Sequence, residues 1–373
     1  MSEASFERST RVSTLELFFD LVFVFTITQL TSVLVAGGDL AAAVQVVVML
    51  AVIWWMYDGY AWLTNAIATD RLRYRIALIG GMGGFLVVAL AIPGAYEGDG
   101  LAFGLAYIVV VLLHGTMYVR GTSVSEVAAI LRIVPYNLAA AGLVVVGGAL
   151  GGDAQWVLWT GTAVLLWVTP WLTSTEGFLV SASHFVERHG LVVIIALGES
   201  VVVIGVGAAA LPLDLEVVVV ALLALALSAS LWWLYFSAED DVEHAMEDAE
   251  PSRRARLAIL GFGYWHYGLL LGVVAMAAGL KKAIGHPYDD VGTWVGLELA
   301  VGVALFVAAD AGFRHTLGIS RSATRLIAAA LALATIPIGT QLSAAGQVGA
   351  LAAIVSVAIA ADGSRRREGA QQS

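Results

Sequence analysis

Long apolar segments recur along the whole chain, and they limit its fold more than any other feature of the sequence. A helix that spans a bilayer needs roughly 20 mostly apolar residues. About twelve segments approach this requirement, so we predict an all-α polytopic membrane protein. The segments are approximately residues 15–36, 40–63, 74–95, 101–119, 125–149, 155–172, 189–210, 215–237, 257–280, 291–311, 323–343 and 346–361.

Composition excludes the other broad classes of protein. The chain is 60% hydrophobic and 13% charged, whereas soluble domains are about 45–50% apolar and about 25% charged. Disorder requires low hydrophobicity and is excluded for the same reason. The 373 residues include no cysteine, which excludes disulfides and thiolate metal sites. A net charge of -10 without a basic patch argues against a nucleic-acid partner.

The distribution of Lys and Arg predicts the orientation of the chain. Nearly all of the 19 Lys and Arg residues lie in the two terminal tails or on the same side as those tails. Such an excess of positive charge is typical of cytoplasmic loops, so we expect both termini in the cytoplasm. The longest connection, residues 239–256, is predicted to be a solvated cytoplasmic helix or loop, with a regulatory or partner-binding loop as the alternative. We expect no cleaved signal peptide.

Three landmarks recur in the same order and indicate an internal duplication. They are Arg75–Gly80 and Arg256–Gly261, Trp54-Trp55 and Trp232-Trp233, and Glu16 and Glu187. The predicted parts are residues 1–180 and 181–362, each a six-helix repeat, followed by a cytoplasmic tail, residues 363–373. Six helices return the chain to the same side of the membrane, so the two repeats would be parallel. Transporters of this kind place their sites at the interface between repeats, near the bilayer midplane.

Polar side chains in the first predicted helix form one candidate site. Glu16 and Asp20 are four residues apart and therefore lie on one helix face, and Gln29 extends the polarity inward. Asp58 and Arg132 lie at comparable depth in other predicted helices, so all of these groups except Gln29 could meet. The functional interpretation is a proton or cation site gated from the cytoplasm. The alternative is a buried ion-pair network that determines how the helices pack.

A second cluster begins the seventh predicted helix. It contains His184, Glu187, Arg188 and His189. The spacing His-x-x-Glu-x-His matches neither the His-Glu-x-x-His zinc motif nor its inverted form, so we expect no metal and no other cofactor. A pH-sensitive cytoplasmic gate would use the near-neutral titration of histidine. Helix capping and packing at the membrane interface is the alternative.

Glu199 lies near the middle of the same predicted helix, roughly 14 Å from its start at 1.5 Å per residue. Ser200 follows it, and His266 lies at similar depth in the ninth predicted helix. These positions predict a Glu199–His266 relay for protons. The alternative is a neutral Glu199 that is hydrogen-bonded for packing.

Two long motifs carry a family resemblance. Residues 16–30 (Glu16-Leu-Phe-Phe-Asp-Leu-Val-Phe-Val-Phe-Thr-Ile-Thr-Gln-Leu30) and residues 184–200 (His184 to Ser200) resemble the bacterial low temperature requirement protein A family. The resemblance covers about residues 10–361 and implies a multi-pass protein of the inner membrane. The family name records growth in the cold, so the resemblance implies no substrate.

A second resemblance concerns Phe18-Phe19-Asp20. It is similar to the Phe-Ser-Asp motif in the first helix of endolysosomal potassium channels, which are also built of six-helix repeats. Here Phe replaces Ser, and the second half of the chain has no equivalent Asp. This resemblance supports an ion channel as an alternative function.

The favoured function is secondary transport of an unidentified small solute or ion, coupled to protons. The first alternative is an ion channel, and the second is a membrane sensor or scaffold in cold or stress adaptation. A lipid-modifying enzyme is disfavoured because the sequence contains no evident nucleophile–base pair and no metal motif. The expected partners are the lipid bilayer and the transported solute, and the formation of homo-oligomers is left open.

Overall fold

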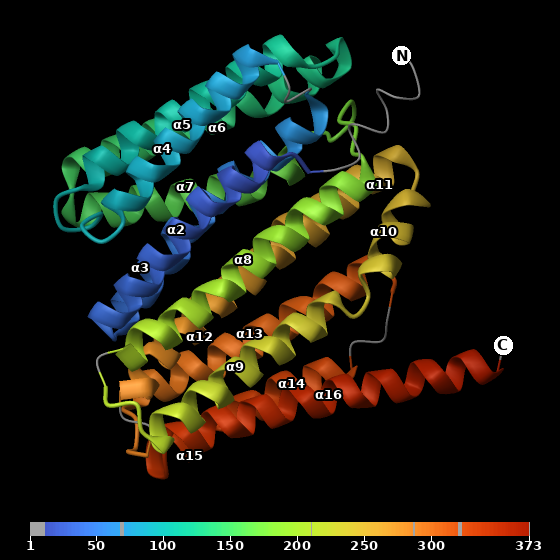
Figure 1. Ribbon diagram of the computed structural model, residues 1–373. Helices are drawn as coiled ribbons and strands as arrows, with labels where there is room; N and C mark the ends of the chain where they lie inside the picture. Colours follow the sequence, from blue (N-terminus) through green and yellow to red (C-terminus); the bar gives the residue numbers. More distant parts are fainter. Residues whose placement is uncertain (1–11, 68–70, 210, 286–287, 320–322, 373) are drawn as a thin grey trace. The chain divides into compact units, whose positions relative to one another are not determined.

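The computed structural model describes residues 12–67, 71–209, 211–285, 288–319 and 323–372, and it contains helices but no strand within these ranges (Figure 1). Its helices are α2 (Thr14–Gly37), α3 (Leu40–Ala66), α4 (Leu72–Ala91), α5 (Gly100–Gly121), α6 (Val124–Leu150), α7 (Gly152–Leu172), α8 (Ala182–Ala209), α9 (Leu215–Phe236), α10 (Glu239–Glu247), α11 (Pro251–Leu257), η1 (Ala258–Trp265), α12 (His266–Gly285), α13 (Thr293–Leu317), α14 (Ala323–Leu333), α15 (Ile336–Gln341) and α16 (Ala344–Gln372). The predicted all-α fold is confirmed.

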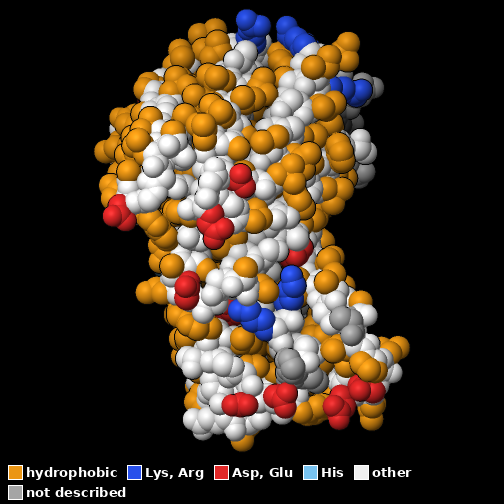
Figure 2. Space-filling model, turned by 90° about the vertical axis from the view of Figure 1, so that its left-hand side faces the viewer, with side chains coloured by type: hydrophobic (Ala, Val, Ile, Leu, Met, Phe, Trp, Pro, Cys, Tyr) orange, Lys and Arg blue, Asp and Glu red, His pale blue; other side chains and the backbone are white. Residues whose placement is uncertain are grey.

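Within the described residues, 11 helical stretches are long and apolar enough to cross a membrane. We predicted about twelve. The predicted segment that is absent from this set is the sixth, residues 155–172. That segment forms α7, a helix of 21 residues, but α7 is not among the 11. Large apolar side chains are exposed on many of the helices, and hydrophobic side chains cover much of the face in Figure 2. Such a surface is suited to lipid.

Helix contacts divide the chain into two compact units. Unit 1 takes its residues from Met1–Val33, Ala43–Val192 and Glu243–Gly263, and unit 2 from Leu34–Ala42, Val193–Val242 and Tyr264–Ser373. In unit 1, α4, α5, α6 and α7 pack against one another in chain order. In unit 2, α13 packs against α12 and α14, and α16 packs against α9 and α14. This division describes packing, and the duplication at residue 180 stays a prediction.

The starts of α2 and α6 are specified by the same local motif. Ser13 precedes α2, and its backbone N–H donates to Glu16 Oε2 over 2.8 Å, while the N–H of Glu16 donates to Ser13 Oγ over 3.3 Å. Ser123 and Glu126 make the same pair of contacts at α6. This is a capping box, in which each side chain satisfies a backbone N–H that has no partner within the helix.

Replacing Ser123 by Ala removes one half of the box at α6. Loss of an N-cap of this kind costs about 1 kcal/mol, so we expect a lower midpoint of thermal unfolding, followed by tryptophan fluorescence. Ser252→Ala, at an exposed serine in α11, is the control and should unfold like the wild type. Equal midpoints for the two variants would contradict a capping role for Ser123.

The predicted cytoplasmic stretch 239–256 consists of α10, a non-helical connection at residues 248–250 and most of α11. Arg254 joins these two helices: its Nε donates to the carbonyl oxygen of Met246 and its Nη2 to that of Glu247, each over 2.7 Å. These carbonyl groups belong to the last turn of α10, where they have no partner within the helix. Arg254 therefore caps α10 from the following helix.

The segment after α11 is a π-helix, η1, which continues into α12. π-helical turns are rare, and many of them occur at functional sites. In unit 1, Trp54 Nε1 of α3 donates to the carbonyl oxygen of Gly263 over 2.7 Å. A Cβ at Gly263 would lie 3.5 Å from Asp58 Oδ2. This part of η1 is therefore placed directly against the polar stretch of α3.

Candidate functional site

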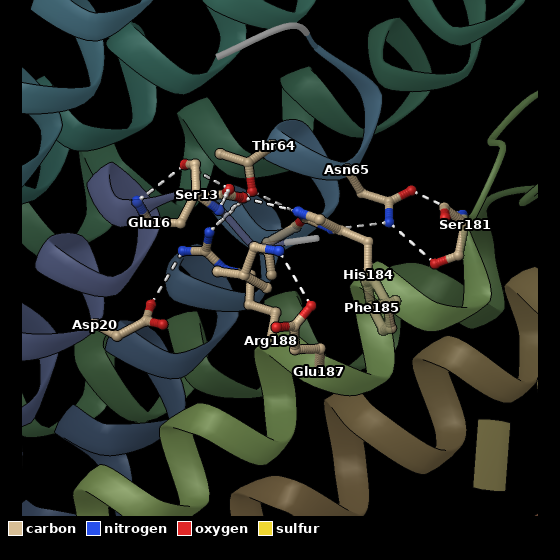
Figure 3. A network of polar contacts seen from close by, with 12 residues as sticks. Ser13, Glu16, Asp20, Thr64, Asn65, Ser181, His184, Phe185, Glu187 and Arg188 are labelled. Atoms are coloured by element: carbon tan, nitrogen blue, oxygen red, sulfur yellow. Dashed lines mark hydrogen bonds and ion pairs between the residues drawn. The ribbon is translucent and has the colours of Figure 1, made fainter. Parts of the chain in front are cut away.

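The N-terminal capping box of α2 also orients a buried carboxylate. Ser13 holds Oε2 of Glu16 through its backbone N–H and through its hydroxyl, over 2.8 and 2.7 Å. The other oxygen, Oε1, accepts from Arg188 Nη1 over 2.8 Å and lies 3.1 Å from His184 Nε2 (Figure 3). Both oxygens of Glu16 are thus bonded, and the side chain is buried.

Asp20 lies one turn further along α2 on the same face, as its spacing from Glu16 predicted. Its Oδ1 accepts from the hydroxyl of Tyr57 over 2.5 Å and from Arg188 Nη2 over 3.1 Å. Its Oδ2 is buried without a hydrogen-bond partner among the described residues. Asp20 is 0% exposed. Of the carboxylate oxygens of Glu16 and Asp20, only Oδ2 of Asp20 has no described hydrogen bond.

Arg188 of α8 connects three helices. Beside its bonds to Glu16 and Asp20 of α2, its Nη1 donates to Thr64 Oγ1 of α3 over 3.0 Å. The guanidinium carbon also lies 5.7 Å from the ring centre of Phe19 and 5.8 Å from that of Tyr57. A planar guanidinium can bond two carboxylates and pack on aromatic rings at the same time.

Hydrogen bonds fix the orientation of the His184 ring. The backbone of Ser181 donates to Asn65 Oδ1 over 2.9 Å and accepts from Asn65 Nδ2 over 3.2 Å. The same Asn65 Nδ2 lies 3.2 Å from His184 Nδ1. The His184 ring is therefore held between Asn65 on one side and Glu16 on the other.

The cluster holds more carboxylates than guanidinium groups. Glu16 and Asp20 contribute two carboxylates, whereas Arg188 supplies one positive charge. A net charge that is buried inside membrane helices is costly. One further proton or cation would neutralise the cluster, and Oδ2 of Asp20 is the atom that is free to take it.

Asp58 and His189 form a second pair beside this cluster. His189 Nε2 lies 3.1 Å from Asp58 Oδ1, and His189 Nδ1 lies 2.9 Å from the carbonyl oxygen of Phe185. Both ring nitrogens of His189 therefore face oxygen atoms. The side chain of His189 is 0% exposed and that of Asp58 is 14% exposed.

The remaining residues predicted near this site lie outside the two clusters. Glu187 accepts from the backbone N–H of Val12 over 3.1 Å, and Gln29 is half-buried further along α2. The expected meeting of Arg132 with the carboxylates is wrong. Arg132 is exposed and donates to the carbonyl oxygen of Glu176, and Arg188 supplies the positive charge instead.

The predicted residues of unit 2 are buried. Glu199 is 4% exposed, Ser200 and His266 are 0% exposed, and Ser200 Oγ has no hydrogen-bond partner in the described chain. His266 Nε2 lies 2.7 Å from the hydroxyl oxygen of Tyr235. The Glu199–His266 relay stays a prediction.

Unit 2 also contains an ion-pair cluster that we did not predict. Asp310 Oδ2 lies 3.0 Å from Arg314 Nε and 2.6 Å from Arg325 Nε, and Arg325 Nη1 lies 2.5 Å from Asp362. Arg314 also donates to the carbonyl oxygens of Leu234 and Tyr235 at the end of α9. The only available signal was the i,i+4 spacing of Asp310 and Arg314, because arginines near helix ends resemble ordinary loop charges.

Replacing Asp310 by Asn removes the charge that both arginines share. Hydrogen bonds to charged groups contribute about 1.5–3 kcal/mol each, so we expect a loss of about 2–3 kcal/mol in the free energy of unfolding. Thermal unfolding of the purified chain measures this loss as a lower midpoint. Asp248→Asn, at an exposed position, is the matched control, and a midpoint for Asp310→Asn as high as that of this control would contradict the prediction.

Known proteins are similar to this chain in sequence. Among the described residues, no group of three or more His, Asp and Glu side chains is arranged to hold a metal ion. An uncharacterized protein of Rhizobium meliloti (strain 1021) is 29% identical over 315 residues, which cover 80% of this chain and 76% of the relative. The sequence profile of the bacterial low temperature requirement A protein (LtrA) matches residues 11–360, a range that includes every residue of both clusters in unit 1. The chain therefore belongs to the bacterial low temperature requirement A family.

Proposed function

We propose that the chain is a secondary transporter in the inner membrane that couples the movement of a small solute to protons, with both termini in the cytoplasm. The observation that carries this proposal is the buried cluster in which one arginine, Arg188, pairs with the two carboxylates of Glu16 and Asp20. Ionisable groups within membrane helices are costly, and they commonly mark ion pathways and proton relays. A proton on Oδ2 of Asp20 makes the cluster neutral, and its release restores the charge.

The pair of Asp58 and His189 is the proposed route to Asp20. Asp58 is partly exposed, so it can exchange protons with water more readily than Asp20. His189 directly follows Arg188 in α8, and Arg188 Nη2 donates to Asp20 Oδ1. Tyr57, which donates to Asp20, directly precedes Asp58 in α3. In the proposed mechanism, a proton gained by the pair passes to the free oxygen of Asp20.

The contacts of Arg188 link this proton to a movement of helices. Arg188 holds α8 to α2 through two carboxylates and to α3 through Thr64. Protonation of Asp20 removes one of the two charge attractions and weakens the hold on α8. A ligand shifts a conformational equilibrium by its different affinity for the two states, and here the ligand is the proton.

Glu199 and His266 are proposed as a second proton site, within unit 2. Both are buried in long apolar helices, where an ionisable side chain is a candidate for function by default. We also propose that the chain consists of two tandem six-helix repeats and that the solute binds between them.

The test uses the purified full-length chain in vesicles that contain the pH dye pyranine and are acidic inside. NaCl, KCl, choline chloride and a mixture of amino acids and nucleosides are added outside in turn, and the internal pH is followed. We expect one of these additions to accelerate proton exit far above the rate in vesicles without protein.

The same preparation separates the alternatives. A channel would conduct current across a planar bilayer without any proton gradient. A sensor or scaffold would give neither solute-dependent proton exit nor current, and this result would contradict the transport proposal.

A further inference from the structure

A groove of about 320 Å³ lies on the surface of unit 1 between α5 and α6. Its walls include Leu112, Gly115 and Val119 of α5, and Leu131 and Val134 of α6. Leu112, Val119 and Leu131 are 50%, 45% and 52% exposed. Both helices are long and apolar enough to cross a membrane, so the exposed apolar walls of the groove are suited to lipid chains.

The polar side chains in the wall of the groove are held from behind by α3. His114 Nε2 donates to the carbonyl oxygen of Gly59 over 2.9 Å. Asn137 Oδ1 accepts from Trp55 Nε1 over 2.9 Å. These bonds fix the wall and leave a mainly apolar surface for an occupant.

One end of the groove is positively charged. Arg120, in the last turn of α5, lines the groove and is exposed. The hydroxyl of Tyr74 donates to the carbonyl oxygen of Arg120, and Arg73 Nη2 donates to that hydroxyl, each over 2.9 Å. Arg73 is therefore held beside the end of α5. The nearby carboxylate of Glu126 is bound in the capping box of α6.

We infer that this groove binds an anionic glycerophospholipid, independently of the transport proposal. One acyl chain lies along the apolar walls, and the phosphate lies at Arg120 and Arg73. Basic pockets at the ends of membrane helices bind anionic headgroups in this manner. A water-soluble anion would leave the apolar walls unfilled, and a zwitterionic lipid would lack the net negative charge that the two arginines favour.

The test counts lipids that stay bound to the purified full-length chain, by native mass spectrometry after exposure to phosphatidylglycerol or phosphatidylcholine. We expect the wild type to retain phosphatidylglycerol preferentially. Arg120→Ala and Arg73→Ala should each weaken its binding about fivefold, since one basic residue near anionic lipid contributes ~1 kcal/mol. Arg253→Ala, at an exposed arginine outside the groove, is the control for charge and should bind as the wild type.

A second pair of variants tests the groove itself. A Cβ at Gly115 would lie 3.9 Å from Val134 Cγ2, whereas one at Gly142 of the same unit would meet no atom within 4 Å. Gly115→Leu should therefore fill the groove and reduce retention of both lipids, and Gly142→Leu should not. Equal retention by Gly115→Leu and Gly142→Leu would overturn the site. Equal binding of the two lipids by the wild type, or free phosphate displacing phosphatidylglycerol completely, would overturn the lipid assignment.

Discussion

Replacing Arg188 by Met should lower the free energy of unfolding by about 3–5 kcal/mol, the usual cost of removing one partner from a buried ion pair. The variant leaves Glu16 and Asp20 buried without a positive charge, and Thr64 loses a donor. Tryptophan fluorescence of the purified chain during heating measures the effect as a large fall in the midpoint of unfolding.

A combined variant separates the charge from the packing. Replacing Glu16 and Asp20 by Gln and Asn in the Arg188→Met background removes the unpaired charges, and we expect it to recover most of the lost stability. Arg253→Met, at an exposed arginine, is the control. If Arg188→Met unfolded at the same temperature as this control, the cluster could not be the link between α2, α3 and α8.

Replacing Asp20 by Asn should reduce solute-dependent proton exit to the rate of vesicles without protein. Asn has the size and shape of a protonated Asp, and its Oδ1 can still accept from Tyr57 and Arg188, so the fold should be kept. It cannot release a proton, so the coupling should be lost. The measurement is the pyranine assay, together with a midpoint of unfolding close to that of the wild type.

Glu187→Gln is the matched control for Asp20→Asn. Glu187 is an acidic residue of the same unit, and its described contact is to the backbone of Val12 outside both clusters. We expect its variant to retain most of the proton exit. Coupling at the wild-type rate in Asp20→Asn would remove Asp20 from the proton path, and loss of coupling in Glu199→Gln alone would place the proton site in unit 2.

Part of the candidate site follows from local sequence alone. The spacing of Glu16 and Asp20 placed both on one helix face, and helical spacing placed His184 and Arg188 together on another. Nothing in the spacing identified Arg188 as the partner of Glu16, because the two residues are separated by more than 170 positions along the chain. Arg132, at a similar predicted depth, was an equally reasonable partner before the helix faces were known.

The ion pairs of unit 2 could not be predicted from the sequence either. Arg314 and Arg325 agree with the excess of positive charge on the predicted cytoplasmic side, so the sequence pattern treats them as ordinary loop charges. In the structure they are 1% and 2% exposed and share Asp310. A rule that counts charges near helix ends cannot tell whether a charge points to water or into the bundle.

The sequence by itself determined the class of this protein, its long apolar helices, the shared helix face of Glu16 and Asp20, and the family to which the chain belongs. These features depend on composition and on contacts a few residues apart, which the order of residues specifies directly. Only the tertiary structure decided that Arg188 pairs with both Glu16 and Asp20, that His184 lies between Asn65 and Glu16, and that Asp58 lies against His189. Each of these contacts joins different helices, and it depends on the rotation and depth of both, which an apolar sequence pattern does not specify.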